Sequence, residues 1–351
     1  MLLGSLWLGG DALPVLDGAV LVDASGKVIA AGPAASIDAP VGVRGIGGPG
    51  SWIGPGMVHA HVHLAFGTPA EALRGGLVGV RDLGAPTTRA LDWQTRTPRQ
   101  GATDVSVAGP LLTAPGGYPS KGWGAQGFAA FVDSPAAARQ ILESLARDGV
   151  DLVKVALEPS AGDVPTLGQL RAVVDAAHAA GLAVTAHALN RDMVHLALDA
   201  GVDELAHTPT QRLRPADIER LAKSGIPVVS TIETHYSGTP TSPVLINAAA
   251  FVAAGIPLIY GTDLGNAGTS PGVDGRELQR LADAGLGWFG ALRAATQGSG
   301  RAAGMRNHPG VIAVGAPAEL LLLPADPQQD KKSWSRATAM YVAGRVVTQP
   351  G

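Results

Sequence analysis

The middle of the chain alternates short apolar runs with longer segments that have one apolar face. The apolar runs are as long as strands and contain few polar residues, which is typical of parallel strands covered by helices on both faces. Eight such runs are expected to be strands: 57–64, 77–82, 103–109, 151–157, 182–187, 203–207, 226–231 and 257–262. Helical patterns lie between them, as at 134–148, 166–180 and 214–223, each followed closely by a glycine that favours its end. This order predicts an α/β fold in which residues 55–308 form one domain, a (β/α)8 TIM barrel.

The two ends of the chain have a different pattern, of short strands joined by tight turns. Predicted strands occupy residues 19–23, 27–31, 319–323, 339–343 and 345–347. The first two flank an Ala-Ser-Gly turn and the last two flank a single glycine, so each pair is expected to form a hairpin. We therefore predict that residues 1–54 and 309–351 combine into one discontinuous domain, a small β-sandwich.

Composition limits the chemistry that the chain can perform. None of its 351 residues is cysteine, so disulfides and thiolate metal sites are excluded, and any metal needs nitrogen or oxygen ligands. The formal net charge of −3 and the lack of a long basic run argue against a nucleic-acid partner. We expect a small-molecule substrate and leave a homo-oligomer open.

The N-terminal residues 1–8 are apolar, but no basic residue precedes them and no clear small-residue cleavage site follows. We interpret them as a first strand, with a signal peptide as the alternative. No other stretch is both long enough and apolar enough to span a membrane. We therefore expect a cytoplasmic protein without a membrane partner.

Two histidines stand out in the first strand of the predicted barrel. His61 and His63 are two residues apart, and alternate residues of a strand point to the same face. Two imidazoles that converge on one point are suited to bind a divalent metal ion. An isolated pair of this kind can equally be two hydrogen-bonded core histidines, so the choice depends on the rest of the chain.

Further polar side chains lie on the later strands. Lys154 is inside the apolar strand 151–157, where a lysine is costly unless it is paired or neutralised. His187, His207 and Asp263 stand at the ends of three other predicted strands. Because the carboxyl ends of barrel strands form the active-site face, we expect these groups to meet there. Each alone could be a core histidine or a helix cap, but together they indicate a metal site.

Several motifs occur in a fixed order along nearly the whole chain. They are Pro-Gly-Met-Val at 55–58, Val-Arg-Asp-Leu-Gly at 80–84, Asp-Leu-Val-Lys-Val at 151–155, Ala-Gly-Val-Asp-Glu-Leu-Ala-His at 200–207, Gly-Thr-Asp at 261–263 and the segment 310–320. Any one of them is a loose pattern, whereas the ordered set is specific. In this set the chain resembles the amidohydrolase superfamily, in particular its binuclear members near prolidase and imidazolonepropionase.

That resemblance implies two divalent metal ions, which we expect to be zinc. His61, His63 and Asp263 would hold one ion. His187 and His207 would hold the other, and Lys154 would bridge the two as a carbamate formed with carbon dioxide. Carbamylation would explain the buried lysine, because it turns a cation into a carboxylate-like anion. The alternative is an ordinary lysine paired with Asp263 and a single metal ion.

The resemblance also implies a reaction, the hydrolysis of an amide-type C–N bond by a hydroxide that bridges two metal ions. Asp263 would be both ligand and catalytic general base, passing the proton to the leaving nitrogen. We expect a dipeptidase or an N-acyl amino acid hydrolase. The alternatives are a mononuclear aminohydrolase (a deaminase) or a lactam hydrolase of the same superfamily, and, from another class, a non-catalytic barrel scaffold.

The chain departs from the family pattern at two positions. His59 stands where relatives usually have aspartate, and we expect it to be structural. In the loop 113–119 a tyrosine replaces the family histidine, which weakens any transfer of substrate preference. Arg81 is expected to pair with Asp82 or another carboxylate. The candidate substrate-binding residues lie on loops after the strands: Tyr118, His235 and Tyr236.

Overall fold

The computed structural model describes residues 1–96, 101–305 and 307–347. Within these ranges the middle of the chain forms two parallel sheets. The smaller sheet has the order β5 (Met57–Val62), β6 (Leu77–Asp82) and β7 (Asp104–Val107). The larger has the order β14 (Leu258–Ile259), β13 (Val228–Val229), β12 (Glu204–Leu205), β11 (Ala183–Ala188), β10 (Leu152–Leu157), β8 (Leu111–Thr113) and β9 (Ala129–Phe131).

The predicted α/β fold with parallel strands is confirmed, and each of the eight predicted strands is present, although β12, β13 and β14 are only two residues long. The short strands β8 and β9 were not predicted. A closed barrel is not found, because the ladder is interrupted between β7 and β8. The segment between them contains Pro110, which has no N–H to donate to a ladder. On the other side, Ala60 N–H donates to the Tyr260 carbonyl at 3.0 Å, so single hydrogen bonds join the two sheets.

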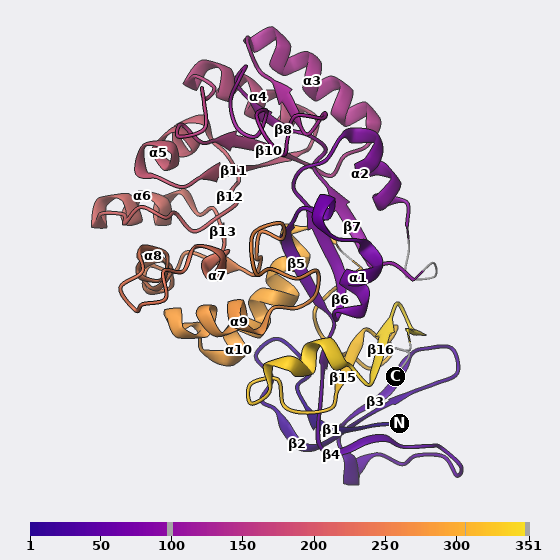
Figure 1. Cartoon of the computed structure of the whole chain (residues 1–351). Coiled ribbons are helices and arrows are strands. Elements are labelled where there is room, and N and C mark those ends of the chain that lie inside the picture. The colour runs from indigo at the N-terminus through magenta and orange to yellow at the C-terminus, as the bar shows by residue number, and fades with distance from the viewer. Residues whose placement is uncertain (97–100, 306, 348–351) are drawn as a thin grey trace.

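Helices cover the outside of these strands (Figure 1). They are α1 (Pro69–Arg74), α2 (Thr87–Gln94), α3 (Pro135–Asp148), α4 (Leu167–Ala179), α5 (Arg191–Ala200), α6 (Pro215–Ser224), α7 (Ile232–His235), α8 (Pro243–Ala253), α9 (Gly275–Leu281), α10 (Gly287–Arg293) and α11 (Ser299–Ala302). Short helical turns are η1 (Ala34–Ser36), η2 (Leu64–Phe66) and η6 (Lys331–Arg336), with π-helical η4 (Ala282–Leu286) and η5 (Ala294–Gly298).

The predicted helix signals can be seen at α3. The Ser134 side chain accepts a hydrogen bond from the Ala137 N–H and so caps the first turn. Ala138, Leu142 and Leu145 form its buried face. The helix ends at Gly149, whose φ of 92° is in the left-handed region that glycine adopts without strain.

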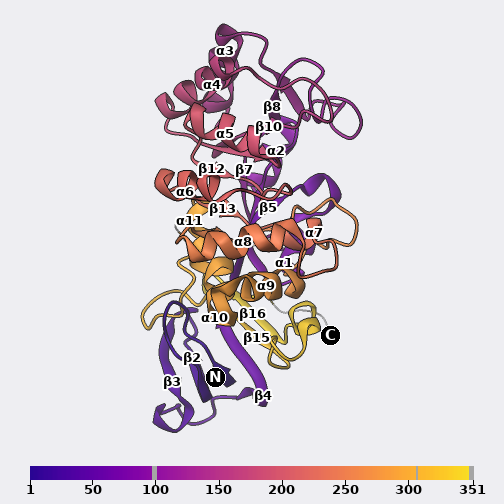
Figure 2. The same cartoon turned by 90° about the vertical axis from the view of Figure 1, so that its left-hand side faces the viewer.

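Both ends of the chain contribute to one further sheet, which lies at one end of the molecule, opposite α3 and α4 (Figure 2). Its order is β17 (Arg345–Val346), β16 (Ala339–Val342), β15 (Leu320–Leu323), β4 (Ile46–Pro55), β1 (Leu2–Leu6), β2 (Val15–Val22) and β3 (Val28–Pro33). The hairpins β2–β3 and β16–β17 were both predicted. The sandwich is not confirmed, because these strands pair into a single sheet. The boundaries at residues 54 and 309 stay a prediction.

The central strand β15 shows how this sheet packs. Leu320 and Leu322 belong to a separate apolar cluster within the sheet, whereas Leu321 and Leu323 belong to the main core. Alternate residues of a strand point to opposite faces, so one face of the sheet packs on the parallel strands and their helices. No helix in the described ranges is long and apolar enough to cross a membrane.

Candidate metal centre

The structure brings the predicted ligands together at the carboxyl ends of the parallel strands. His61 and His63 come from β5 and its end, Lys154 and His187 from β10 and β11, and the other two follow β12 and β14. All are buried. One atom each of His61, His207 and Asp263 lies within 4.8 Å of the other two, a grouping that could hold a metal ion.

The first ligand group consists of His61, His63 and Asp263. The Nε2 atoms of the two histidines lie 3.2 and 3.3 Å from Asp263 Oδ1. Ligand atoms about 2.0–2.1 Å from a tetrahedral zinc ion are roughly 3.3 Å apart, so this spacing suits a metal. His61 Nδ1 lies 2.8 Å from the Ala206 carbonyl, to which it donates, and this leaves the Nε2 lone pair facing the centre.

The second ligand group consists of His187 and His207. His187 Nδ1 lies 3.0 Å from His207 Nε2, again a separation that suits two ligands of one ion. Glu158 Oε2 accepts a hydrogen bond from His187 Nε2 at 3.1 Å, which directs the Nδ1 lone pair toward His207. This hydrogen bond lowers the pKa of Glu158 to about 2, so the residue is a carboxylate at neutral pH.

Lys154 lies next to the first ligand group, with its Nζ 3.5 Å from His61 Nε2. Burial lowers its pKa to about 7, so a large fraction is the neutral amine at neutral pH. A neutral amine is the form that can react with carbon dioxide. In the described part of the chain no ion pair joins Lys154 to Asp263, which was the alternative role for this lysine.

Three histidines at this centre, His61, His187 and His207, are neutral. Burial, with the positive charge of Lys154 second, lowers the pKa of His61 to about 3, and burial also lowers the pKa of His187 and His207. Burial alone would raise the pKa of Asp263, but its interactions with His61 and His63 hold it well below the usual range. Neutral imidazoles and an ionised carboxylate are the forms that bind metal ions.

Of the three candidate substrate-binding residues, two contact the centre. The Tyr118 ring stacks on His187 with the centroids 5.4 Å apart, and the His235 ring lies 5.9 Å from that of His207. His235 Nε2 is buried without a hydrogen-bond partner among the described residues. Tyr236 instead lies under the Arg280 guanidinium, with Cζ 3.8 Å from the ring centroid, and among the described residues it has no ring contact with a candidate metal ligand.

Two residues near the centre were not predicted. Glu158 directly follows β10, and its place just after a predicted strand was a usable signal. Trp123 lies in the loop between β8 and β9, where its ring centroid is 5.1 Å from that of His63. Its Nε1 donates to the Tyr118 hydroxyl at 3.1 Å. No periodic pattern marks this loop, so the sequence offered no signal for the direction of the tryptophan.

His59 and Arg81 lie deeper, beneath the centre. His59 Nε2 is 2.8 Å from the Thr262 hydroxyl, and burial lowers the pKa of this histidine to about 3. Arg81 forms a buried ion pair of 2.5 Å with Glu204 and donates through Nε to the Ala60 carbonyl. The carboxylate partner of Arg81 is therefore Glu204 rather than Asp82.

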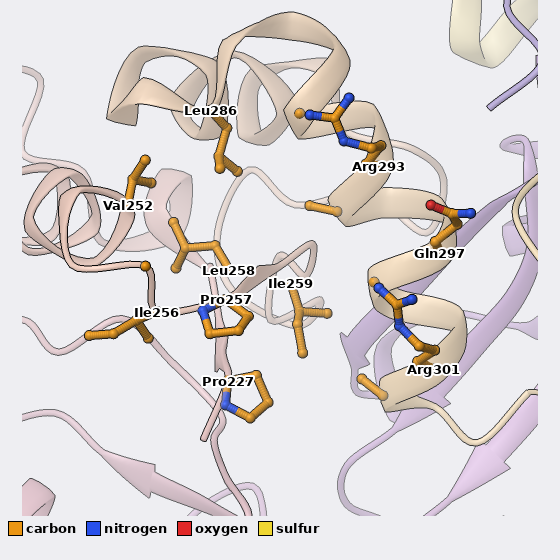
Figure 3. Close-up of a pocket in the computed structure, with 15 residues that line it drawn as sticks. Pro227, Val252, Ile256, Pro257, Leu258, Ile259, Leu286, Arg293, Gln297 and Arg301 are labelled. Atoms are coloured by element: carbon orange, nitrogen blue, oxygen red, sulfur yellow. The ribbon is translucent and has the colours of Figure 1, made fainter. Parts of the chain in front are cut away.

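A separate groove of about 660 Å³ opens at the amino ends of β13 and β14 (Figure 3). Arg293, Gln297 and Arg301 lie along one side of it, and apolar residues such as Leu258 and Leu286 lie opposite. Pro227 and Pro257, which precede these two strands, belong to its lining. The groove is thus at the opposite end of the strands from the ligands, and its lining includes none of them.

Comparison with known proteins places the chain in a family. Residues 52–347 match the sequence profile of the amidohydrolase family. The chain belongs to this family. It is therefore an amidohydrolase, an enzyme that acts on carbon–nitrogen bonds, and the non-catalytic scaffold is set aside.

Individual relatives are distant from this amidohydrolase. It is 29% identical over 333 residues to an uncharacterized protein of Mycobacterium tuberculosis, covering 84% of this chain and 85% of the relative. It is 28% identical over 378 residues to the imidazolonepropionase of Stenotrophomonas maltophilia, covering 92% and 90%. The solved structure of a Xaa-Pro dipeptidase superposes with a TM-score of 0.82 at 16% identity, over 99% of each chain, and supports the fold.

Proposed function

We propose that this amidohydrolase is a binuclear metal-dependent hydrolase of small amides, acting as a dipeptidase or an N-acyl amino acid hydrolase. The observation that carries the proposal is the presence of two separate groups of buried ligand atoms, with a buried lysine beside the first group. His61, His63 and Asp263 would hold one zinc ion. His187 and His207 would hold the other.

We assign to Lys154 the role of bridging ligand between the two ions. A buried lysine without an ion pair is costly as a cation, and its lowered pKa favours the neutral amine that forms a carbamate. Such a carbamate would carry two oxygens, and two oxygens suit one ligand bond to each ion.

Two bound divalent ions would supply an activated water and polarise the substrate carbonyl. The protein then has to move one proton from the water to the leaving nitrogen. We assign this proton transfer to Asp263, whose Oδ1 faces His61 and His63 and whose Oδ2 accepts a hydrogen bond from Asn266 Nδ2 at 2.9 Å. Tyr118 and the unpaired Nε2 of His235 are available to bind polar groups of the substrate.

A second candidate function is a one-metal reaction, either deamination or lactam opening. It is favoured by the compact group of His61, His207 and Asp263, which could hold a single ion. Imidazolonepropionase is the name of one relative. The buried Lys154 has no role in such a site, and we therefore place this candidate second.

A hydrolysis screen with zinc-loaded protein tests the proposal. The substrates would be N-acyl amino acids, dipeptides, lactams and nucleobase analogues, and Asp263→Asn protein would be the control for contaminating activity. We expect release of free amino acids from one of the first two classes. Turnover restricted to lactams, or ammonia released from nucleobase analogues, would favour the second candidate and contradict the first.

A further inference from the structure

An aromatic wall stands on one side of the centre. We define it as Tyr118 and Trp123, supported by Phe66 and Phe128. The Trp123 ring centroid lies 5.8 Å from that of Phe66 and 5.4 Å from that of Phe128, and its Nε1 donates to the Tyr118 hydroxyl. The tryptophan is thus fixed by packing and by one hydrogen bond, so that little conformational entropy is lost when a ligand contacts it.

The aromatic wall contacts both ligand groups. Trp123 packs on His63 of the first group, and Tyr118 stacks on His187 of the second. A substrate whose carbonyl reaches between these groups therefore has the wall beside its scissile bond. Trp123 is only partly buried, so part of its ring remains accessible.

The surface that the wall offers is apolar. Within residues 114–128 the sequence has one charged side chain, Lys121, and that side chain is exposed. Two arginines near Tyr236 are already paired, since Arg280 binds Glu233 at 2.9 Å and Arg276 binds Asp274. The wall itself thus offers aromatic rings for stacking rather than charged groups.

We propose that Trp123 and Tyr118 determine specificity, and that the enzyme selects substrates with an aromatic or broad apolar group next to the scissile amide. This inference rests on the proposed function, because it needs a metal centre that positions the carbonyl. It narrows the substrate class to amides such as N-aroyl or N-arylacyl amino acids. Small acyl groups such as acetyl would leave the wall uncovered.

Hydroxamic acids can test the aromatic wall without knowledge of the substrate, because the hydroxamate group chelates divalent metal ions and its acyl group can be varied. Dissociation constants of acetohydroxamate and benzohydroxamate would be measured on the zinc-loaded protein by calorimetry. We expect benzohydroxamate to bind about tenfold more tightly or better, from ring stacking and the apolar area removed from water. Cyclohexane hydroxamate would separate aromatic stacking from apolar contact.

Substitutions in the aromatic wall then test whether the wall causes the preference for benzohydroxamate over acetohydroxamate. Trp123→Ala should reduce the ratio of the two dissociation constants to below about threefold, whereas Trp123→Phe should retain most of the ratio. Phe131→Ala is the matched control, because Phe131 is an exposed aromatic of β9 with no ring contact to the wall among the described residues. It should leave the ratio unchanged.

Three results would overturn the inference. One is a ratio near one in the unaltered protein, and another is a ratio that Trp123→Ala does not change. Equal loss of both ligands in Trp123→Ala would mean that the tryptophan supports the centre and does not select the acyl group. Failure of every hydroxamate to bind the zinc-loaded protein would instead reject the metal centre itself, and the inference with it.

Discussion

Two buried clusters of histidine and carboxylate in this molecule have opposite protonation states. In one, His308 lies between Glu319, which faces its Nδ1, and Asp104, which is 3.0 Å from its Nε2. Burial lowers the pKa of His308, but these two carboxylates outweigh burial and raise it to about 9. In the metal centre, burial and the cation of Lys154 lower the pKa of His61 to about 3.

The difference comes from how many carboxylates face each ring. His308 has one at each nitrogen, so both nitrogens carry protons and neither can bind a metal. It joins Asp104 of β7 to Glu319 at the start of β15, and so ties the parallel strands to the terminal sheet. Around the candidate metal centre Asp263 faces three histidines and Glu158 faces the fourth, His187, so none of these rings has a carboxylate at each nitrogen in the described part of the chain. The proton state, more than the residue types, separates a structural cluster from a metal site.

The largest expected effect of a substitution is at Lys154. Lys154→Arg should lose activity to background, because a guanidinium stays charged and cannot form a carbamate. Turnover with the best substrate from the screen would be measured alongside bound zinc. An active Lys154→Arg enzyme would contradict the bridge.

Lys154→Ala separates a failure of the bridge from a failure of folding. This variant should also lose metal and activity, but short carboxylic acids with bicarbonate should restore part of both. Circular dichroism would confirm that the variant folds. No rescue in a folded variant would count against a bridging role.

Asp263→Asn should lower kcat by about a hundredfold or more, the usual scale for a positioned base, with an unchanged thermal midpoint. Asp263 has a φ of 58°, a left-handed conformation that asparagine also tolerates, so the backbone should be preserved. Kinetics and thermal unfolding would be measured together. A near-normal rate would make His235 the next candidate for proton transfer, and an unfolded variant would make Asp263 structural.

The His308 cluster predicts a pH dependence of stability rather than of catalysis. The folded pKa of about 9 lies above the ordinary value of about 6.5, so the stabilisation is fully present below pH ~6.5 and is lost as pH rises through 9. Its size is about 3 kcal/mol. Urea unfolding of the metal-free protein at pH 6.5 and 9.5 would measure it.

His308→Gln is the control for this pH dependence, since glutamine does not titrate. The unaltered protein should lose about 3 kcal/mol more than the variant between the two pH values. If His308→Gln does not fold, Glu319→Gln provides the same comparison. Equal losses of unfolding free energy in the unaltered protein and the variant would show that the charged form of His308 does not stabilise the fold.

The smallest effect is expected at Glu158. Glu158→Gln should weaken binding of one zinc ion by about tenfold, because the amide no longer holds the His187 proton as firmly as the carboxylate does. Binding of the other ion, which His61, His63 and Asp263 would hold, should be unaffected. Competition with a chelator would measure both affinities. Glu143→Gln, at an exposed position of α3, is the matched control.

The sequence predicted the long buried strands well, because they are continuous apolar runs. β5, β6, β10 and β11 each lie within two residues of the predicted bounds. β8 and β9 are three residues long, too short to show a pattern. The break in the barrel was also missed, since backbone pairing across a loop leaves no periodic signal.

The residues of the candidate site likewise differ in how well the sequence predicted their positions. Residues on strands or directly after them, such as His61 and His187, could be placed because strand geometry fixes their direction. The position of Trp123 could not be predicted, because the direction of its side chain depends on how the loop packs against Phe66 and Phe128. The His308 cluster joins residues 204 positions apart, His308 and Asp104, and no local pattern connects them.

The metal content of the protein tests the central claim most directly. Protein produced with ample zinc and dialysed against metal-free buffer would be analysed for zinc per chain, together with Lys154→Ala. We predict about two ions per chain in the unaltered protein and fewer in the variant, because the ligand atoms form two separate groups and Lys154 lies beside the first of them. Saturation at one ion, with no change in Lys154→Ala, would contradict the binuclear centre.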